Sequence, residues 1–520
     1  MTALGRRWAA DAVRKPLFRH VVSPFSARVL RPGSTAARRR LEAFEWLDPE
    51  AVRQAQWSSL GALLRHAAAT VPYYRRTFAE LGLGPNDFAA PGSPGEAPRP
   101  RLTPDDFARL PILSKPTVRK EFPDGLVSEH RGHTWLPWRR PKVFRTSGTT
   151  GMPLRFYRDP ALRAHDHATR VWQYAWAGLQ PGDQVTYMRM TVYVSPWLYP
   201  FWSFFGGARH FPSHLYLDRD GEGIARVLDL WRPDGLIGHP PSLTLAAQAL
   251  RAAGRSLRHP PKGIIVGGET VGRRDWRLMR EAFGSPVHVH YGANEFGIHV
   301  AQSCPDRVAR GEPPYENLHI SALRFLVEIV DDDGRPVEPG REGRIIITDL
   351  GNRLMPFIRY DLGDRGTLAR EPCPCGRGLP LLGSLQGRTA ETLVLPSGRR
   401  RNGALLSLAM DARADAIWEY QFRQTAIDHI EVAVVPAPGV TFGTAEQENL
   451  ARGLRDLLGE PIEISFQLVD VIPRDPSGKR PLLKTLPGSE RPGGIDEWPL
   501  PVTCGGFSSG TSSHRPSSEG

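Results

Sequence analysis

The amino-acid sequence predicts an α/β protein with a large, multi-layered N-terminal domain and a small α+β domain near its C-terminal end. At 520 residues the chain exceeds the size at which one hydrophobic core keeps growing. Short apolar strands alternate with helical segments between residues 222 and 295, as in α/β layers. From about residue 324 the pattern changes to strand pairs and a single later helix.

The N-terminal part predicts helices. Apolar residues such as Leu60 and Leu64 recur at helical spacing within residues 45–85, and Pro72 closes the pattern. Residues 160–178 also have a helical pattern. A helix, a short apolar strand and a second helix then follow one another between residues 222 and 254.

Two further strands end in glycine turns that carry a carboxylate. Residues 263–269 form a short apolar strand that ends in Gly-Gly-Glu, and residues 287–295 repeat this design with Tyr-Gly-Ala-Asn-Glu. In α/β layers, ligands bind beyond the carboxyl ends of the strands. These turns are therefore candidate binding segments.

The second half predicts antiparallel pairing and a small unit. Residues 325–330 and 344–348 flank an Asp-Asp-Asp-Gly turn and are expected to pair. The expected elements of the small unit are strands near 391–395 and 429–435, a helix near 444–458 and a strand near 461–472. We expect four parts: a basic arm (1–44), a large domain (45–387), a small domain (388–487) and a disordered tail (488–520).

Charge and cysteine content exclude several classes of protein. The net charge is +12, but residues 1–41 hold ten Arg or Lys residues and one acidic residue, so the remainder is close to neutral. We expect no nucleic-acid partner, and the arm is either a solvated tail or a weak contact for an anionic surface. Four cysteines do not make a disulfide framework, and a cytoplasmic location is expected.

An uncharged stretch over residues 190–208 has the length of a bilayer span. Pro196 and Pro200 interrupt it, and it is aromatic where a spanning helix is aliphatic, so we expect no transmembrane segment. A pocket wall or ordinary core is predicted for its Trp197, Tyr199, Phe201 and Trp202.

The stretch over residues 146–151 is suited to bind an anion. It consists of Thr146, Ser147, Gly148, Thr149, Thr150 and Gly151. Glycine lets the backbone approach a phosphate, and hydroxyl and amide groups donate to anionic oxygens. The Gly-Lys-Ser/Thr ending of a kinase-type phosphate loop is missing, and alone the stretch is also typical of a surface turn.

Five further motifs follow this stretch in order. They are Gly267-Gly268-Glu269, Tyr291-Gly292-Ala293-Asn294-Glu295, Arg359-Tyr360-Asp361-Leu362-Gly363-Asp364, Gly387-Arg388 and Pro473-Arg474-Asp475-Pro476-Ser477-Gly478-Lys479. Each is weak alone. In this order, over residues 45–484, the chain resembles the adenylate-forming enzyme superfamily and, within it, the phenylacetate–CoA ligase family with its capsule-biosynthesis-type members.

The resemblance implies an adenylation domain followed by a small mobile domain that rotates between two half-reactions. A carboxylic acid and ATP first give an acyl-adenylate and pyrophosphate, and a thiol, usually that of coenzyme A, then attacks the adenylate. This route splits one difficult step into two easier ones. Donors and Mg²⁺ are implied near the phosphates, where charge accumulates.

The resemblance also implies roles for individual residues. Residues 146–151 hold the β- and γ-phosphates of ATP. The adenine is bordered by Gly268, Glu269, Tyr291, Gly292, Ala293 and Asn294, with Tyr291 stacking on it. Glu295 carries Mg²⁺. Asp364 accepts the ribose hydroxyls, Arg388 assists, and Lys479 reaches the acyl and α-phosphate oxygens during adenylation only. Without these neighbours, Asp364 and Lys479 are typical of turns and Glu295 of a surface carboxylate.

Three positions depart from the family pattern. Asn294 stands where the family often has Thr or Ser, which replaces a hydroxyl donor by an amide. Leu154 stands where the superfamily often has Lys, which removes a positive charge from the phosphate loop. Ala390-Glu391 replaces the usual acidic pair and leaves the hinge position open.

The cysteines suggest a metal site. Cys373-Pro374-Cys375-Gly376-Arg377 matches an element seen in this family, and with Cys304 and a histidine it offers four ligands for a structural Zn²⁺. His319 is the preferred fourth ligand and His299 the substitute. The one-residue gap between the cysteines is tighter than common zinc spacings, so buried free thiols are the alternative.

The sequence therefore predicts an acid–thiol ligase that uses ATP, Mg²⁺ and coenzyme A and acts on an aromatic or apolar carboxylic acid. One rival keeps adenylation but passes the acyl group to an amine or a carrier protein. Another is a non-catalytic nucleotide-binding accessory protein of polysaccharide biosynthesis. The intact Glu295, Asp364 and Lys479 favour an enzyme.

Overall fold

The computed structural model describes most of the chain. The described residues are 16–17, 20–21, 24–25, 32–88, 103–130, 141–145, 154–188, 208–211, 215, 219–388, 392–397, 400–402, 406, 409–410, 416–437, 439–473 and 482–484. The predictions that lie outside them concern residues 146–151, Lys479, the aromatic stretch up to residue 207, most of the basic arm, and the tail. None of the described helices combines the length and the apolar character that a membrane span needs.

The N-terminal helices follow the predicted pattern. Helix α3 (Ser34–Phe44) lies within the segment predicted as an arm, yet Leu41 and Phe44 are buried in one cluster with Trp172 of α8 (Arg163–Ala175). Among the described residues, packing against the large domain therefore begins at about residue 34. Helix α4 (Pro49–Thr70) begins at Asp48, whose carboxylate accepts a hydrogen bond from the Ala51 amide at 2.9 Å. Shorter helices follow, namely α5 (Pro72–Glu80), η2 (Pro85–Phe88), α6 (Pro104–Ala108) and α7 (Lys115–Glu121).

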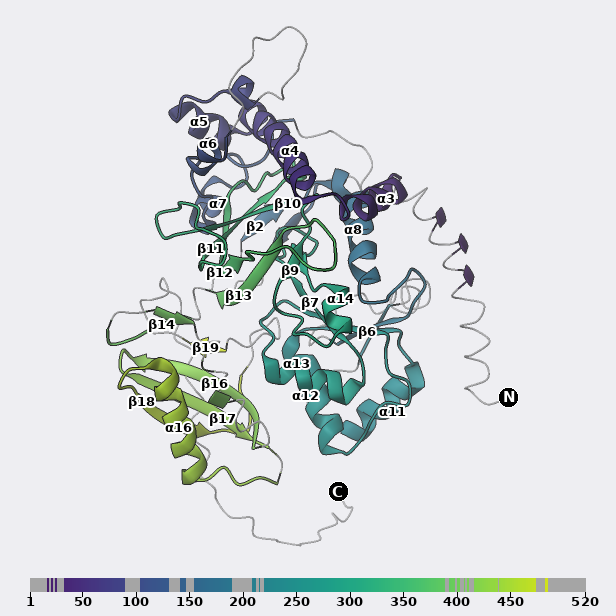
Figure 1. The fold of residues 1–520 in the computed structure, drawn as a ribbon, viewed down its shortest axis with the longest axis vertical. Helices are drawn as coiled ribbons and strands as arrows, with labels where there is room; N and C mark the ends of the chain where they lie inside the picture. Colours follow the sequence, from purple (N-terminus) through teal and green to yellow (C-terminus); the bar gives the residue numbers. More distant parts are fainter. Residues whose placement is uncertain are drawn as a thin grey trace, which may run out of the picture.

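An eleven-stranded sheet forms the centre of the molecule, in the order β10-β11-β12-β13-β9-β8-β7-β6-β5-β3-β4 (Figure 1). One part is parallel and alternates with helices, as predicted. Its elements are β3 (Val185–Met188), β4 (Ala208–His210), α11 (Gly221–Trp231), β5 (Gly235–Gly238), α12 (Pro240–Ala252), β6 (Gly263–Gly267), α13 (Arg273–Phe283) and β7 (Val287–Tyr291). Its central strands are buried at almost every position, because both faces of the sheet are covered.

The other part of the sheet is antiparallel. Its elements are β8 (Ala301–Gln302), α14 (Pro305–Ala309), β9 (Leu318–Ile320), β10 (Phe325–Val330), β11 (Gly343–Asp349), β12 (Tyr360–Leu368) and β13 (Leu381–Arg388). The predicted pair of strands around the Asp-Asp-Asp-Gly turn is confirmed, with Val327 opposite Ile347. A separate ribbon of β1 (Val143–Arg145) and β2 (Arg155–Tyr157) flanks the Gly/Thr stretch on both sides.

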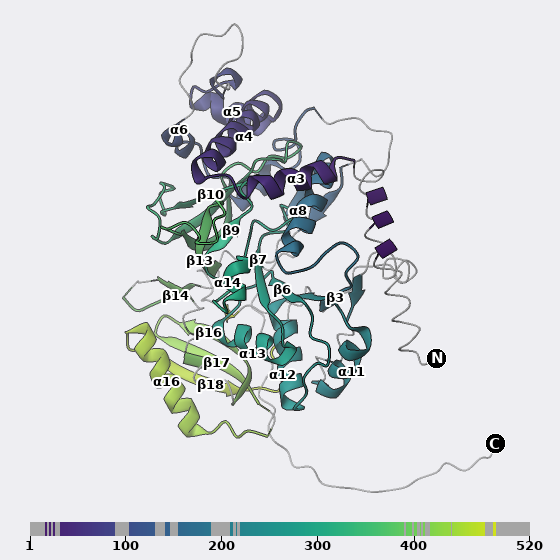
Figure 2. The ribbon, with the colours of Figure 1, turned by 45° about the vertical axis from the view of Figure 1, so that its right-hand side comes forward.

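The C-terminal unit has its own sheet and apolar cluster. The sheet order is β18-β17-β16-β19, and α16 lies along one face (Figures 1 and 2). Its elements are β16 (Ile417–Ala426), β17 (His429–Pro436), α16 (Thr444–Leu458), β18 (Glu463–Leu468) and β19 (Leu483–Lys484), preceded by the pair β14 (Thr392–Val394) and β15 (Arg400–Asn402). Phe422, Val432 and Leu454 are fully buried in this cluster. The predicted helix and the two strands on either side of it are confirmed.

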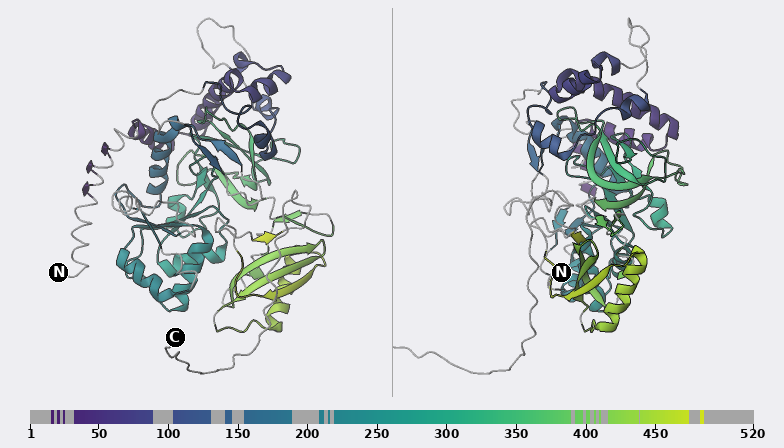
Figure 3. Two further views of the ribbon diagram at one scale, coloured as in Figure 1. Left: turned by 180° about the vertical axis from the view of Figure 1, so that it is seen from behind. Right: turned by 90° about the vertical axis from the view of Figure 1, so that its left-hand side faces the viewer.

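The small sheet is seated against helices of the parallel part (Figure 3). Gln248 of α12 donates to the Trp418 carbonyl at 2.6 Å, and Arg274 of α13 donates to the Ile417 carbonyl. The Arg219 guanidinium lies 4.8 Å from the centre of the Trp418 ring. Trp418 is 5% exposed and belongs to the same apolar cluster as the large sheet.

Candidate active site

The turn after β7 carries a carboxylate into the interior. Gly292 runs close to the next segment, since a Cβ at this position would lie 3.0 Å from the His299 Cα. Asn294 is exposed, whereas Glu295 is only 4% exposed. The Tyr360 hydroxyl, at the start of β12, donates to Glu295 Oε1 at 2.9 Å. A buried carboxylate requires such a partner because burial without one is costly.

The predicted ribose ligand lies beside the same turn. The Tyr291 hydroxyl donates to Asp364 Oδ2 at 2.8 Å, although the two residues are 73 positions apart. Asp364 is in β12, opposite Arg388 of β13 in the strand ladder. The structure thus brings Tyr291, Glu295 and Asp364 to one edge of the sheet.

The Gly-Gly-Glu turn adjoins this edge. Gly267 at the end of β6 is paired with His290 of β7, so Gly268 and Glu269 follow β6 next to the end of β7. Gly268 has a φ of +90°, and a Cβ there would lie 2.7 Å from His239 Nδ1. The His239 ring is also 3.1 Å from the Gly267 carbonyl. Only glycine accommodates both this backbone conformation and the histidine.

An arginine that the sequence analysis did not single out supports the turn after β7. The Arg158 guanidinium donates through Nε to the Asn294 carbonyl at 3.0 Å and lies 4.2 Å from the centre of the Phe144 ring. Phe144 lies in β1, directly before the Gly/Thr stretch, so Arg158 links the approach to that stretch with the Asn294–Glu295 turn. Burial lowers the pKa of Arg158, and the nearby Asp166 and Glu295 carboxylates oppose this shift.

Comparison with known proteins assigns the family. Residues 143–355 match the family described as "AMP-binding enzyme", and residues 393–485 match the family described as "CapK C-terminal domain". The chain thus contains an AMP-binding enzyme domain followed by a CapK C-terminal domain. Four of the six motifs lie within these segments, and the motifs at residues 359–364 and 387–388 lie between them.

Relatives of this AMP-binding enzyme are distant in sequence. A phenylacetate-coenzyme A ligase of Thermus thermophilus is 25% identical over 465 residues, which cover 84% of this chain and 96% of the relative. One of Pseudomonas putida is 24% identical over 379 residues, which cover 69% and 76%. A solved 2-hydroxyisobutyryl-CoA ligase in the postadenylation state, in complex with R3-HIB-AMP, has a TM-score of 0.66 at 19% identity and covers 86% of this chain and 91% of that one. This likeness concerns the fold.

A cysteine and histidine cluster lies elsewhere on the sheet of the enzyme. Ligand atoms of Cys304, His319, Cys373 and Cys375 all lie within 4.8 Å of one another. The Cys304 and Cys373 sulfurs are 3.7 Å apart, and Cys375 Sγ is 3.5 Å from His319 Nε2. His319 is in β9 and is fully buried. Of the two candidate histidines, the cluster thus contains His319.

The pKa values of His319 and Cys375 in this cluster are shifted in opposite directions. Burial alone would lower the pKa of His319, but hydrogen bonds with the three thiols outweigh it and raise the pKa to about 10. Burial raises the pKa of Cys375, but the hydrogen bond with His319 and the neighbouring Arg377 lower it to about 6. Without a metal the pair favours a thiolate beside an imidazolium.

His299, the substitute candidate, has other partners. Its Nδ1 is 3.0 Å from His290 Nδ1 and 3.3 Å from Gln173 Oε1. Burial, and then the adjacent His299, lower the pKa of His290 well below its usual value, so His290 is neutral. His299, itself half-buried, therefore forms a polar group with His290 of β7 and Gln173 of α8.

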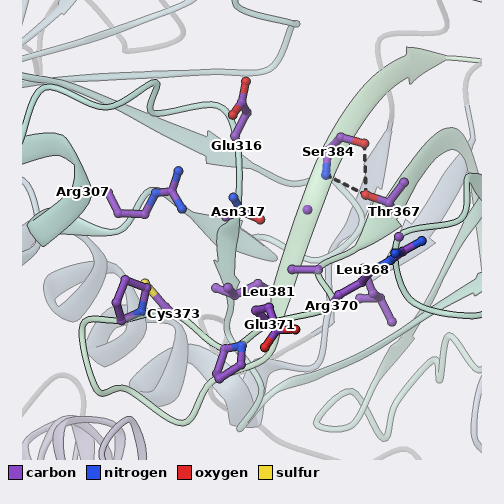
Figure 4. A pocket seen from close by; sticks show the side chains of 15 residues that line it. Arg307, Glu316, Asn317, Thr367, Leu368, Arg370, Glu371, Cys373, Leu381 and Ser384 are labelled. Carbon is purple, nitrogen blue, oxygen red and sulfur yellow. Dashed lines mark hydrogen bonds between the residues drawn. The ribbon is translucent and has the colours of Figure 1, made fainter.

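A cavity of about 570 Å³ adjoins the cysteine cluster (Figure 4). Cys373, Arg307 and Glu316 line it, together with Thr367 and Ser384, whose hydroxyls are 3.1 Å apart. None of the predicted nucleotide residues that the structure describes lines this cavity. It is thus separate from the strand-end site around Glu295.

Proposed function

We propose that this enzyme activates a carboxylic acid with ATP and then passes the acyl group to a thiol, with coenzyme A as the first choice. The observation that carries the proposal is the meeting of Tyr291, Glu295 and Asp364 at one sheet edge in an AMP-binding enzyme. Relatives named phenylacetate-coenzyme A ligase support the same reaction class and an aromatic or apolar acid.

The proposed chemistry balances in two steps. A carboxylate oxygen attacks the α-phosphorus of ATP and forms the acyl-adenylate. The bond from the α-phosphorus to the bridging oxygen breaks, and pyrophosphate leaves with that oxygen and the bonding electron pair. The thiol sulfur then attacks the acyl carbonyl carbon, AMP leaves, and the thiol proton passes to solvent. In the first step, negative charge on the phosphates needs neutralisation.

Each predicted site residue has a proposed role in this reaction. Tyr291 and Gly268 border the adenine, and Asp364 accepts the ribose hydroxyls. Residues 146–151 donate to the β- and γ-phosphates, Arg388 assists at the domain junction, and Lys479 reaches the acyl and α-phosphate oxygens. Glu295 suits Mg²⁺, because it is a buried carboxylate with one oxygen engaged by Tyr360, and Mg²⁺ commonly binds one or two carboxylates plus phosphates. When bound, Mg²⁺ neutralises charge on the phosphate oxygens.

A pyrophosphate-release screen over a panel of carboxylic acids tests the proposal. Wild-type enzyme with ATP and Mg²⁺ is expected to release pyrophosphate with at least one aromatic or apolar acid. Adding coenzyme A is expected to yield the thioester. Release of pyrophosphate without thioester would point to an amine or a carrier protein as acceptor. No release and no ATP binding would contradict the proposal and favour a non-catalytic protein.

We also propose that Cys304, His319, Cys373 and Cys375 hold a structural Zn²⁺. A tetrahedral ion about 2.3 Å from sulfur and about 2.0–2.1 Å from nitrogen separates two sulfurs by roughly 3.8 Å and sulfur from nitrogen by roughly 3.6 Å. The observed separations of 3.7 Å and 3.5 Å suit this geometry. Three sulfurs and one nitrogen leave no open position, as in structural sites. About one equivalent of zinc is expected in purified protein. Well under one equivalent, with no loss of stability on chelation, would leave buried thiols as the answer.

We propose that the basic arm of this cytoplasmic enzyme makes a weak contact with an anionic surface. Leu17, Val21 and Phe25 are exposed and spaced by four residues, and the surrounding sequence is rich in arginine. Co-sedimentation with anionic vesicles, compared with neutral vesicles, tests this. Equal recovery with both would leave the arm as a solvated tail.

A further inference from the structure

Tyr360 makes a polar contact with a buried carboxylate. It is fully buried, and its hydroxyl donates to Glu295 Oε1 at 2.9 Å. Among the residues that the structure describes, Tyr360 is the hydrogen-bond partner of this carboxylate. An ionised carboxylate only accepts hydrogen bonds, so the phenol is the donor.

The surroundings of Tyr360 hold its ring in place. The ring centroid is 4.8 Å from that of Phe357 and 6.4 Å from that of Phe296. Its backbone is paired with Ile347 of β11 and bridged to Leu113 on its other side. A tyrosine restrained in this way points its hydroxyl in one direction, and it does so without a flexible stem.

This direction decides which oxygen of Glu295 is left for a ligand. Oε1 is engaged by Tyr360, and no hydrogen bond to Oε2 is found among the residues that the structure describes, so Oε2 can meet an ion. Mg²⁺ demands near-octahedral geometry at about 2.0–2.1 Å and tolerates misdirected ligands poorly. Groups that orient a ligating side chain therefore affect metal affinity.

We infer that Tyr360 is a positioning residue that aims the Glu295 carboxylate at the metal ion of the ATP complex. The inference rests on the proposed function, in which Glu295 carries Mg²⁺. A purely structural hydroxyl would instead affect the stability of the fold and leave the metal dependence of nucleotide binding unchanged.

The test is Tyr360→Phe, which removes the hydroxyl and keeps the ring. Tyr74→Phe is the matched control, because Tyr74 is also buried and also hydrogen-bonded, but to the Pro356 carbonyl at 2.9 Å and to the Ile358 amide at 3.2 Å. Calorimetry measures the affinity of a non-hydrolysable ATP analogue with Mg²⁺ and with a chelator, and the affinity of AMP. A titration of the adenylation rate gives the half-saturating Mg²⁺ concentration.

In Tyr360→Phe the half-saturating Mg²⁺ concentration is expected to rise about tenfold, the lower end of the effect of losing an orienting partner. The gain in affinity for the ATP analogue on adding Mg²⁺ shrinks accordingly, AMP binding stays unchanged, and Tyr74→Phe resembles wild type. In a Glu295→Gln background, Tyr360→Phe is expected to add no further loss.

An unchanged Mg²⁺ dependence in a folded Tyr360→Phe protein would overturn the inference. If that variant fails to fold, Tyr360→Met, which fills the space without a donor, provides the same measurement. If wild-type enzyme binds the ATP analogue equally well with Mg²⁺ and with chelator, the proposed metal role of Glu295 fails, and the two failures are thereby told apart.

Discussion

Chemically active side chains lie close together in two regions of the same sheet. The two regions differ in how many of their polar atoms already contact one another. Around Glu295, three of the described groups lie close together, and in the proposed mechanism the Gly/Thr stretch and Lys479 join them from other parts of the chain. Around His319, four ligand atoms lie within 4.8 Å of one another. A site that turns over substrate keeps positions open, whereas a structural metal site is closed. We therefore expect damage to the first region to affect activity, and damage to the second to affect stability.

The largest expected effect comes from Lys479→Ala. Adenylation is expected to fall by at least about 10²-fold, the usual size for losing one transition-state contact. Thioester formation from pre-made acyl-adenylate survives nearly unchanged, and so does the melting temperature. If both half-reactions fell together, the role assigned to Lys479 would be wrong.

Cys373→Ser is expected to behave in the opposite way. Removing one ligand of a closed site costs stability, and we expect about 2–3 kcal/mol, within the range for losing a structural element of this kind. The melting temperature falls and zinc content drops, while adenylation at low temperature stays within a few-fold of wild type. Cys504→Ser, in the tail, is the control. Equal melting temperatures for both variants would contradict the closed-site reading.

We expect the stability of the fold to fall in acid because of a buried histidine in β7, the strand that leads to Glu295. Burial lowers the pKa of His288 in β7 to about 4, below its usual value of 6.5. Protonation of His288 therefore favours the unfolded chain. The stability that the neutral, buried His288 preserves is fully present above pH 6.5 and is lost as the pH falls toward 4. At about 1.4 kcal/mol per pKa unit, roughly 1–2 kcal/mol disappears between pH 7 and pH 5. His288→Gln should flatten this part of the stability profile, as read from urea unfolding, and an unaltered slope would contradict the assignment.

The smallest expected effect concerns Arg158. Arg158→Met removes the donor to the Asn294 carbonyl and the cation–π contact with Phe144, and keeps an unbranched apolar side chain at this position. We expect the KM for ATP to rise about fivefold, near 1 kcal/mol, which is the typical net contribution of one hydrogen bond. Stability changes little, because Arg158 is only half-buried. A loss of stability without a change in KM would place Arg158 with the structural region.

Local patterns in the sequence predict much of this architecture. The strands that end near Gly267 and Tyr291, the helix over 444–458 and the pairing of residues 325–330 are all recoverable from apolar runs and turn residues. The structure places His319, and not His299, beside the three cysteines, while zinc binding there stays a prediction.

Contacts between distant segments escape such patterns. The Tyr360–Glu295 hydrogen bond joins residues 65 positions apart, and the contact of Arg158 with the Asn294 carbonyl spans 136. A single buried tyrosine or arginine has no characteristic spacing that announces its partner. The long strand β16 and its contacts with α12 and α13 were likewise absent from the prediction, because they depend on how the small domain is seated.

The seating of the small domain has an optical consequence. Where Gln248 and Arg274 hold the main chain at Ile417 and Trp418, the indole of Trp418 is shielded from water under Arg219. Lifting the domain would hydrate that ring and shift its emission to longer wavelength. The difference in fluorescence between the native chain and Trp418→Phe would therefore report any movement of the small domain away from α12 and α13, with no added label.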